Sequence, residues 1–310
     1  MTKPPAAVLP PLTRRQWLAG LAGTSLLAPR AGFAQAQAPT AKPIPEPQRQ
    51  TLVAGPTKVR LRPSPPVETE IWAFDGATPA PPLRIRQGET LALKLENKTT
   101  APLDLHWYGL RGEAERDGAA SFTRPPIAPG ETGEFRITPQ DSGILLYRPL
   151  RAGGSSEPAG RGLSGLVIVE EKEPLPVDLD LPVLVTDWLI GDDQAIQPFV
   201  PQGNASASAG RLGSWLTVNG RSPPLPITAR PGARIRLRLA NACNARIMRL
   251  RFDGGKATVI AVDSQPTESF EPVRSQLPFA PGTRYDVILD LPIEVGAAVN
   301  ISALIGGGLP

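Results

Sequence analysis

The stretch that decides the fold lies at residues 86–97 and reads Arg-Gln-Gly-Glu-Thr-Leu-Ala-Leu-Lys-Leu-Glu-Asn. Its glycine permits a tight turn, and its leucines recur at every second position, as in a strand with one buried face. Residues 230–241 read Arg-Pro-Gly-Ala-Arg-Ile-Arg-Leu-Arg-Leu-Ala-Asn and align with the first stretch without a gap. The chain therefore carries the same turn, strand and turn twice.

The repeat continues beyond these strands. Ala-Pro-Gly stands at residues 128–130 and again at 280–282, and another alternating strand follows each copy. The strand after the second copy is predicted to keep apolar side chains on its core face and charged side chains outside, the latter being Arg284, Asp286 and Asp290. A repeat this long indicates a duplicated domain rather than a solenoid. With 38 prolines and short strands between turns, the pattern favours two β-sandwiches in an all-β chain.

The formal net charge of +4 originates at the N-terminus. Residues 1–34 hold four of the 33 basic residues and none of the 29 acidic ones, so the rest of the chain is balanced. Binding to nucleic acid requires a basic excess in the folded part. We therefore expect no nucleic-acid partner.

The N-terminus resembles an export signal. Residues 13–18 read Thr-Arg-Arg-Gln-Trp-Leu, like a twin-arginine motif, and a moderately apolar run and small residues near Ala34 follow. The pattern predicts a twin-arginine signal peptide over residues 1–34, a periplasmic protein, and no membrane span after cleavage. An ordinary secretory signal or a disordered basic tail is the alternative. Residues 35–50, rich in Ala, Pro and Gln, are predicted to be a disordered tether.

The single histidine of the chain lies in a second informative stretch, residues 105–111, which read Leu-His-Trp-Tyr-Gly-Leu-Arg. Apolar and polar residues alternate from position 103 to 108, which predicts a strand with His106 and Tyr108 on its polar face. A His-x-His pair on a strand can reach one metal cluster, because both rings lie on the same face. Here Tyr108 stands at the second position.

This stretch resembles the His-Trp-His-Gly-Leu segment of multicopper oxidases, enzymes built from cupredoxin domains. Residues 117–132, 141–150 and 162–169 are similar to further segments of that family, and the resemblance extends over about residues 71–290. It implies two tandem cupredoxin-like Greek-key β-sandwich domains, at residues 51–173 and 174–310, with the third domain of the family absent. The charged, proline-punctuated stretch at 170–176 marks the boundary.

The resemblance also assigns the copper-ligand positions. The first domain of the family supplies two His-x-His pairs, which correspond here to His106, Tyr108, Arg148 and Leu150. Only one imidazole remains, and copper electron-transfer sites need imidazole and thiolate together. Cys243 has no ligand neighbours and is expected to be a small buried hydrophobe. We therefore expect no catalytic residue, no bound metal and no cofactor, although copper is the cofactor of the family.

Arg148 carries a permanent positive charge that cannot be left buried and unpaired. The resemblance places Asp117 near the vestigial site. We predict an Arg148–Asp117 ion pair, with Tyr108 and His106 completing a hydrogen-bonded plug. The alternative is that Arg148 binds a small anion. His106 itself is expected to be a structural, hydrogen-bonded imidazole rather than a metal ligand.

A basic ladder follows two predicted strands of the second half and comprises Arg234, Arg236, Arg238, Arg249 and Arg251. Such a ladder is expected to be the solvated face of a sheet. Its functional alternative is a docking face for an acidic partner.

These expectations favour an exported, non-catalytic protein that binds or scaffolds a periplasmic protein or envelope component. In export signal and ligand loss the chain is similar to a copper-free cell-division protein of the same fold. The alternative is part of a copper-dependent oxidoreductase, completed by a separate or missing C-terminal cupredoxin domain. A non-functional remnant is the third possibility.

Overall fold

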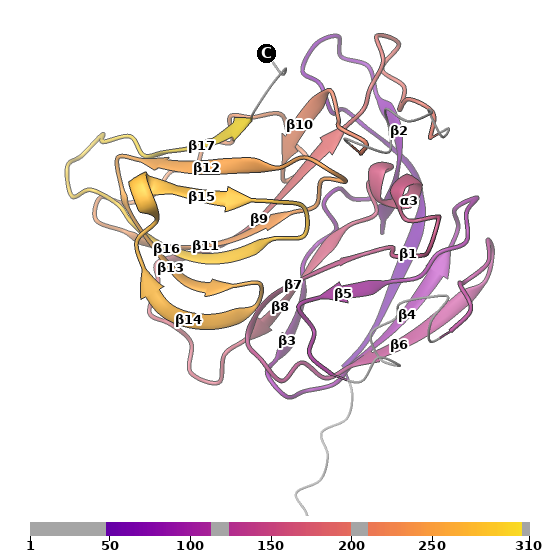
Figure 1. Cartoon of the computed structure of the whole chain (residues 1–310), viewed down its shortest axis with the longest axis horizontal. Helices are drawn as coiled ribbons and strands as arrows, with labels where there is room; N and C mark the ends of the chain where they lie inside the picture. The colour runs from indigo at the N-terminus through magenta and orange to yellow at the C-terminus, as the bar shows by residue number, and fades with distance from the viewer. Residues whose placement is uncertain (1–47, 113–123, 200–209, 306–310) are drawn as a thin grey trace, which may run out of the picture. The chain divides into compact units, whose positions relative to one another are not determined.

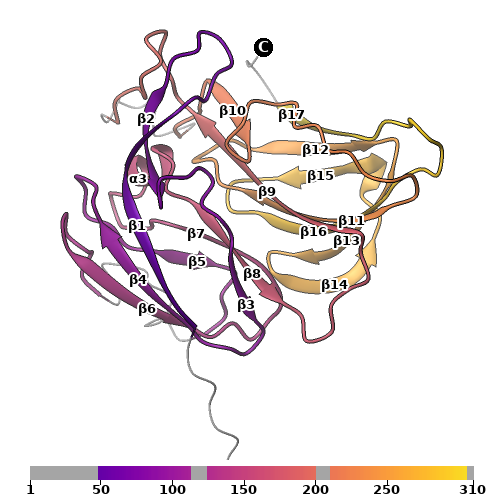
Figure 2. The ribbon, with the colours of Figure 1, turned by 180° about the vertical axis from the view of Figure 1, so that it is seen from behind.

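The computed structural model describes residues 48–112, 124–199 and 210–305, which form two β-sandwiches (Figures 1 and 2). In the first sandwich, one sheet has the strand order β2-β1-β4-β6 and the other has the order β3-β8-β7-β5. The strands are β1 (Gln48–Val59), β2 (Thr69–Phe74), β3 (Leu83–Arg86), β4 (Leu91–Asn97), β5 (His106–Tyr108), β6 (Thr132–Ile137), β7 (Gly143–Arg148) and β8 (Gly165–Glu170). The short helix α3 (Ser156–Gly160) connects β7 and β8.

The second sandwich pairs a sheet of order β10-β9-β11-β16-β13-β14 with a sheet of order β15-β12-β17. Its strands are β9 (Leu179–Trp188), β10 (Trp215–Val218), β11 (Arg234–Asn241), β12 (Met248–Asp253), β13 (Lys256–Val262), β14 (Gln265–Phe270), β15 (Gln276–Phe279), β16 (Arg284–Asp290) and β17 (Asn300–Ile305). A 3₁₀ turn, η1 (Val273–Ser275), lies between β14 and β15. The all-β prediction with two tandem sandwiches is confirmed, and several of the sheets are mixed rather than purely antiparallel.

The sequence repeat is also a structural repeat. Strand β4 lies parallel to β1 and antiparallel to β6, and β11 lies parallel to β9 and antiparallel to β16. The asparagine that ends each copy is buried, and its amide group donates to two backbone carbonyls across the loop that follows. The glycine of each Ala-Pro-Gly turn donates its N–H to that asparagine's carbonyl, from Gly130 to Asn97 and from Gly282 to Asn241, both at 2.8 Å.

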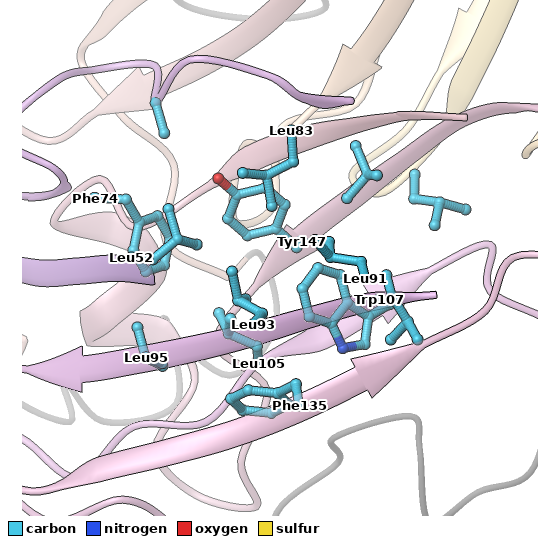
Figure 3. Close-up of a cluster of buried hydrophobic side chains, with 14 of the residues drawn as sticks. Leu52, Phe74, Leu83, Leu91, Leu93, Leu95, Leu105, Trp107, Phe135 and Tyr147 are labelled. Atoms are coloured by element: carbon cyan, nitrogen blue, oxygen red, sulfur yellow. The ribbon is translucent and has the colours of Figure 1, made fainter. Parts of the chain in front are cut away.

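Each sandwich has its own core, formed by the inward faces of its two sheets. In the first, leucines of β1 and β4 pack against Trp107 and Tyr147 of the opposite sheet (Figure 3). The ring centroids of Trp107 lie 5.5 Å from Tyr147 and 6.0 Å from Phe135. In the second, aliphatic side chains of β11 and β16 pack against β12 and β15.

A third apolar cluster joins the two sandwiches. It contains Ile144, Leu146 and Leu166 from β7 and β8, and Leu184 and Ala240 from β9 and β11. Strand β7 is therefore covered on both faces, which explains why residues 144–147 read as a continuous apolar run rather than an alternation.

The predictions for the N-terminus fall mostly on residues outside the described part of the chain. The signal peptide at 1–34 lies wholly outside it. The predicted tether at 35–50 overlaps β1, which begins at Gln48 because residues 48–50 pair with β4. Within the described residues, no helix has the length and apolar character needed to cross a membrane.

Candidate functional site

Strand β5 carries the site at the edge of its sheet. It pairs with β7 so that His106 lies opposite Arg148, and Trp107 lies opposite Tyr147. The alternation predicted from sequence holds here, because Trp107 is buried in the core while His106 and Tyr108 share the other, partly exposed face. The rings of His106 and Tyr108 meet edge to face, with centroids 4.5 Å apart.

Arg148 ends β7 and connects the two sandwiches. Its Nε donates a hydrogen bond to the Tyr108 hydroxyl at 3.1 Å, and one terminal nitrogen donates to the Cys243 carbonyl of the second sandwich at 3.2 Å. The guanidinium carbon lies 4.9 Å from the centroid of the Tyr108 ring, within the range of a cation–π contact. The structure thus brings together three of the four positions that the resemblance marks as vestigial ligands: His106, Tyr108 and Arg148.

The fourth position, Leu150, follows directly after the strand. Its backbone N–H donates to the carboxylate of buried Asp104 at 3.0 Å, which fixes the chain where β7 ends. Asp117 lies outside the described residues, so the Arg148–Asp117 ion pair stays a prediction.

A second arginine lies near Tyr108, and the sequence did not assign it to the site. Arg284 of β16 is buried, and its guanidinium donates to the Gly282 carbonyl and, at 3.2 Å, to the Ser264 hydroxyl. Burial lowers the pKa of Arg284, and Asp263 at 3.6 Å partly offsets this. Tyr108 packs on this region, because a Cβ added at Gly282 would lie 3.5 Å from its ring.

A buried ionic cluster lies between the sandwiches on the same sheet. Asp286 of β16 accepts hydrogen bonds from Arg236 and Arg238 of β11. Arg236 also pairs with Glu171 at 2.6 Å, and Arg238 pairs with Asp180 at 2.7 Å. All three of Asp286, Arg236 and Arg238 are at most 4 % exposed.

The predicted solvated ladder is therefore wrong for Arg236 and Arg238, and Arg284 and Asp286 are buried although the strand pattern placed them outside the core. These residues do point away from the core of their own sandwich, as the alternation requires, but the first sandwich covers that face. The exposed part of the ladder is divided between two sheets, with Arg234 on β11 and Arg249 and Arg251 on β12.

We tested whether the residues present fit the copper cluster of the family. Within the described ranges, no group of three or more His, Cys, Asp or Glu side chains is placed to hold a metal ion. The four positions that the resemblance assigns to copper ligands hold one imidazole, whereas a guanidinium has only N–H donors and leucine has no ligand atom. Arg148 also places a fixed positive charge beside His106 and Tyr108. This donor set does not fit copper.

The backbone of Cys243 contacts the site through Arg148, but its thiol is buried and unreactive. The prediction that it is a small buried hydrophobe is confirmed, because its side chain is buried and packs in the core of the second sandwich. Burial raises the pKa of the Cys243 thiol well above its ordinary value, with further contributions from nearby Asp187. The thiolate, which is the reactive form, is therefore suppressed in the folded protein.

We expect Cys243 in the folded chain to react with an aromatic disulfide reagent at least tenfold more slowly than a free cysteine, because it is both buried and protonated. Unfolding in guanidinium chloride should restore one fast-reacting thiol per chain. The absorbance of the released thiolate measures both rates. Rapid labelling of the folded protein at mildly alkaline pH would contradict the described burial.

Comparison with known proteins identifies the family. Two protein-family models, both described as multicopper oxidase, match this sequence, one over residues 57–174 and the other over residues 180–297. A crystal structure of a multi-copper oxidase from Pseudomonas thermotolerans superposes with a TM-score of 0.76 at 31% identity, over 83% of this chain and 62% of that one. Taken together with the two sandwiches, these matches show that the chain belongs to the multicopper oxidase family and contains two of its cupredoxin domains.

Curated relatives include both oxidases and a protein named for another role. Laccase-1 of Cryptococcus neoformans var. grubii is 27% identical over 248 residues, covering 72% of this chain and 39% of the laccase. Cell division protein FtsP of Proteus mirabilis is 28% identical over 241 residues, covering 76% of this chain and 49% of that protein. The chain thus spans less than half the length of either relative.

Proposed function

We propose that this chain is an exported multicopper-oxidase-like protein with degenerate copper sites, which binds or scaffolds a periplasmic protein or envelope component and does not oxidise a substrate. The observation that carries the proposal is the placement of Arg148. Its guanidinium donates hydrogen bonds to the Tyr108 hydroxyl and the Cys243 carbonyl, at a position that the resemblance assigns to a ligand imidazole.

Electrostatics supports the loss of copper. A guanidinium stays protonated at any physiological pH and offers no lone pair, so it can only repel a metal cation at the same place. In a partly buried site this repulsion is stronger than in water, because the effective dielectric constant is lower. Arg284, which is buried and interacts electrostatically with Tyr108, adds another positive charge near the site.

Two further observations support the export and the binding role. The motif at residues 13–18 resembles a twin-arginine signal. The similarity to a protein named for cell division covers as much of this chain as the similarity to the laccase. A relative that is not named as an oxidase supports a role other than oxidation for this chain.

An oxidase assay tests the proposal. The purified chain is incubated with copper sulfate, desalted, and supplied with hydroquinone while dioxygen consumption is recorded. We expect the rate to equal that of a His106→Ala variant treated in the same way. A dioxygen consumption that the wild type shows and His106→Ala lacks would overturn the proposal. It would favour the alternative that the chain is a copper-dependent oxidoreductase.

A further inference from the structure

One end of the second sandwich is formed by three neighbouring loops. They are the turn between β12 and β13, the segment around η1, and the loop between β16 and β17. Figures 1 and 2 both show η1 and the β16–β17 loop at the same end of this sandwich, away from the first one. The three loops surround an open hollow of about 690 Å³, lined among others by Gly254, Glu271, Ser275 and Pro292.

Two apolar tips project beside this hollow. Val273 in η1 is 80% exposed, and Ile293 and Val295 in the β16–β17 loop are 80% and 91% exposed. Within the described part of the chain, these are the three most exposed large hydrophobic side chains. Single exposed apolar residues are ordinary, but three gathered around one hollow are typical of an interaction site.

The charges that line the hollow are already neutralised within the chain. Lys256 pairs with Glu271 at 3.0 Å, and Asp290 pairs with Arg234 at 2.7 Å. Asp253 pairs with Arg251 at 2.8 Å. The rim therefore attracts neither a strongly acidic nor a strongly basic partner.

Each tip carries one remaining charge, and the two charges have opposite signs. Arg274 follows Val273, and Glu294 lies between Ile293 and Val295. Among the described residues, neither Arg274 nor Glu294 forms an ion pair with its own chain. Arg274 also has a left-handed backbone (φ 53°), a strained state for this residue type, and Pro272, two residues before it, is buried.

We propose that this end of the molecule is the contact between two copies of the chain, related by a two-fold axis. In such a contact the same patch meets itself, so a patch needs complementary features on its own surface. The Val273–Arg274 tip of one copy would face the tip formed by Ile293, Glu294 and Val295 of the other. Each Arg274 then gains a Glu294 partner, and the apolar side chains leave water.

Other occupants fit the observations less well. A lipid surface is usually bound by basic or aromatic side chains, whereas this patch has balanced charges and aliphatic tips. Addition of a foreign strand is disfavoured at the adjacent edge strand β14, because it carries Pro266 and pairs with β13 through a bulge between Val259 and Ala261.

Sedimentation velocity from about 1 μM to about 1 mM covers the dissociation constants expected for a contact made by loop tips. We expect a concentration-dependent dimer in the wild type. Arg274→Glu and Glu294→Arg should each weaken association at least tenfold, and the double swap Arg274→Glu/Glu294→Arg should restore it. Val295→Asp should give a monomer, whereas Ile247→Asp, at a residue 68% exposed elsewhere, should leave the dimer intact.

Restoration by the charge swap separates a contact between copies from a loss of folding. A wild-type chain that stays monomeric throughout the range would overturn the proposal, as would a dimer that none of the tip variants weakens. Flotation with phosphatidylcholine–phosphatidylglycerol vesicles is the companion measurement. Binding of a monomeric wild type that Val295→Asp abolishes would assign the patch to a lipid surface instead.

Discussion

Replacing Asp286 with alanine is expected to lower the free energy of unfolding by about 3–5 kcal/mol, one of the largest effects of any single substitution in this chain. The carboxylate accepts hydrogen bonds from both Arg236 and Arg238, and Asp286 and Arg238 are each 2% exposed. Removing it leaves two buried guanidinium groups with Glu171 and Asp180 as their remaining partners. Urea unfolding followed by tryptophan fluorescence measures the loss.

The same strand supplies a matched control. Asp290 lies four residues further along β16 and forms an ion pair with Arg234. In the pairing of β11 with β16, Asp290 lies opposite Arg234 just as Asp286 lies opposite Arg238. The Asp290 pair is open to solvent, where ion pairs contribute little. Asp290→Ala should therefore cost only a small fraction of the Asp286→Ala effect. Equal costs would show that the cluster between the sandwiches is hydrated rather than buried.

Gly109→Ala is expected to destabilise the chain by about 2–5 kcal/mol. The glycine follows Tyr108 with a backbone φ of +95°, which costs an L-residue about 1–2 kcal/mol. An added Cβ would also overlap the Ser264 hydroxyl and lie 2.8 Å from Arg284 Nη2. Arg284 is held by Gly282 and Ser264 and cannot move freely, so overpacking adds about 1–3 kcal/mol.

Gly88→Ala separates the two contributions. Gly88 has a similar backbone angle, φ +84°, but an added Cβ would meet no atom within 4 Å. It should therefore show the conformational cost alone, and the difference between the two variants measures how closely the sandwiches approach at Gly109. Thermal or urea unfolding of both variants provides the comparison. Identical costs would contradict the close approach.

The fold could be predicted largely because its repeat is local in sequence. Each copy of the repeat predicts its strand, β4 or β11, from about a dozen residues that include the alternating aliphatic side chains and the closing asparagine. Asn97 and Asn241 then satisfy equivalent backbone carbonyls in the two copies, so the same sequence pattern serves the same hydrogen bonds twice.

Only part of the candidate site could be predicted from the sequence. His106, Tyr108 and Arg148 could be brought together, because the strand period and the resemblance place them on one face. Arg284 and the Cys243 carbonyl could not be assigned to the site, because they belong to the second sandwich and lie 95 or more residues beyond Arg148 in the sequence. A period-two pattern distinguishes the two faces of a strand, but it cannot say that a neighbouring domain covers the polar face. Arg236 and Arg238 were predicted as solvated for the same reason.

Copper content of the purified chain tests the central claim most directly. The protein is incubated with copper sulfate, desalted, and analysed for copper by elemental mass spectrometry, beside a His106→Ala variant. A fixed guanidinium at a position that the resemblance assigns to a copper ligand predicts no copper in the wild type beyond that in the variant. One or more copper ions per chain in the wild type, lost in His106→Ala, would contradict the account and make the oxidase alternative the better description.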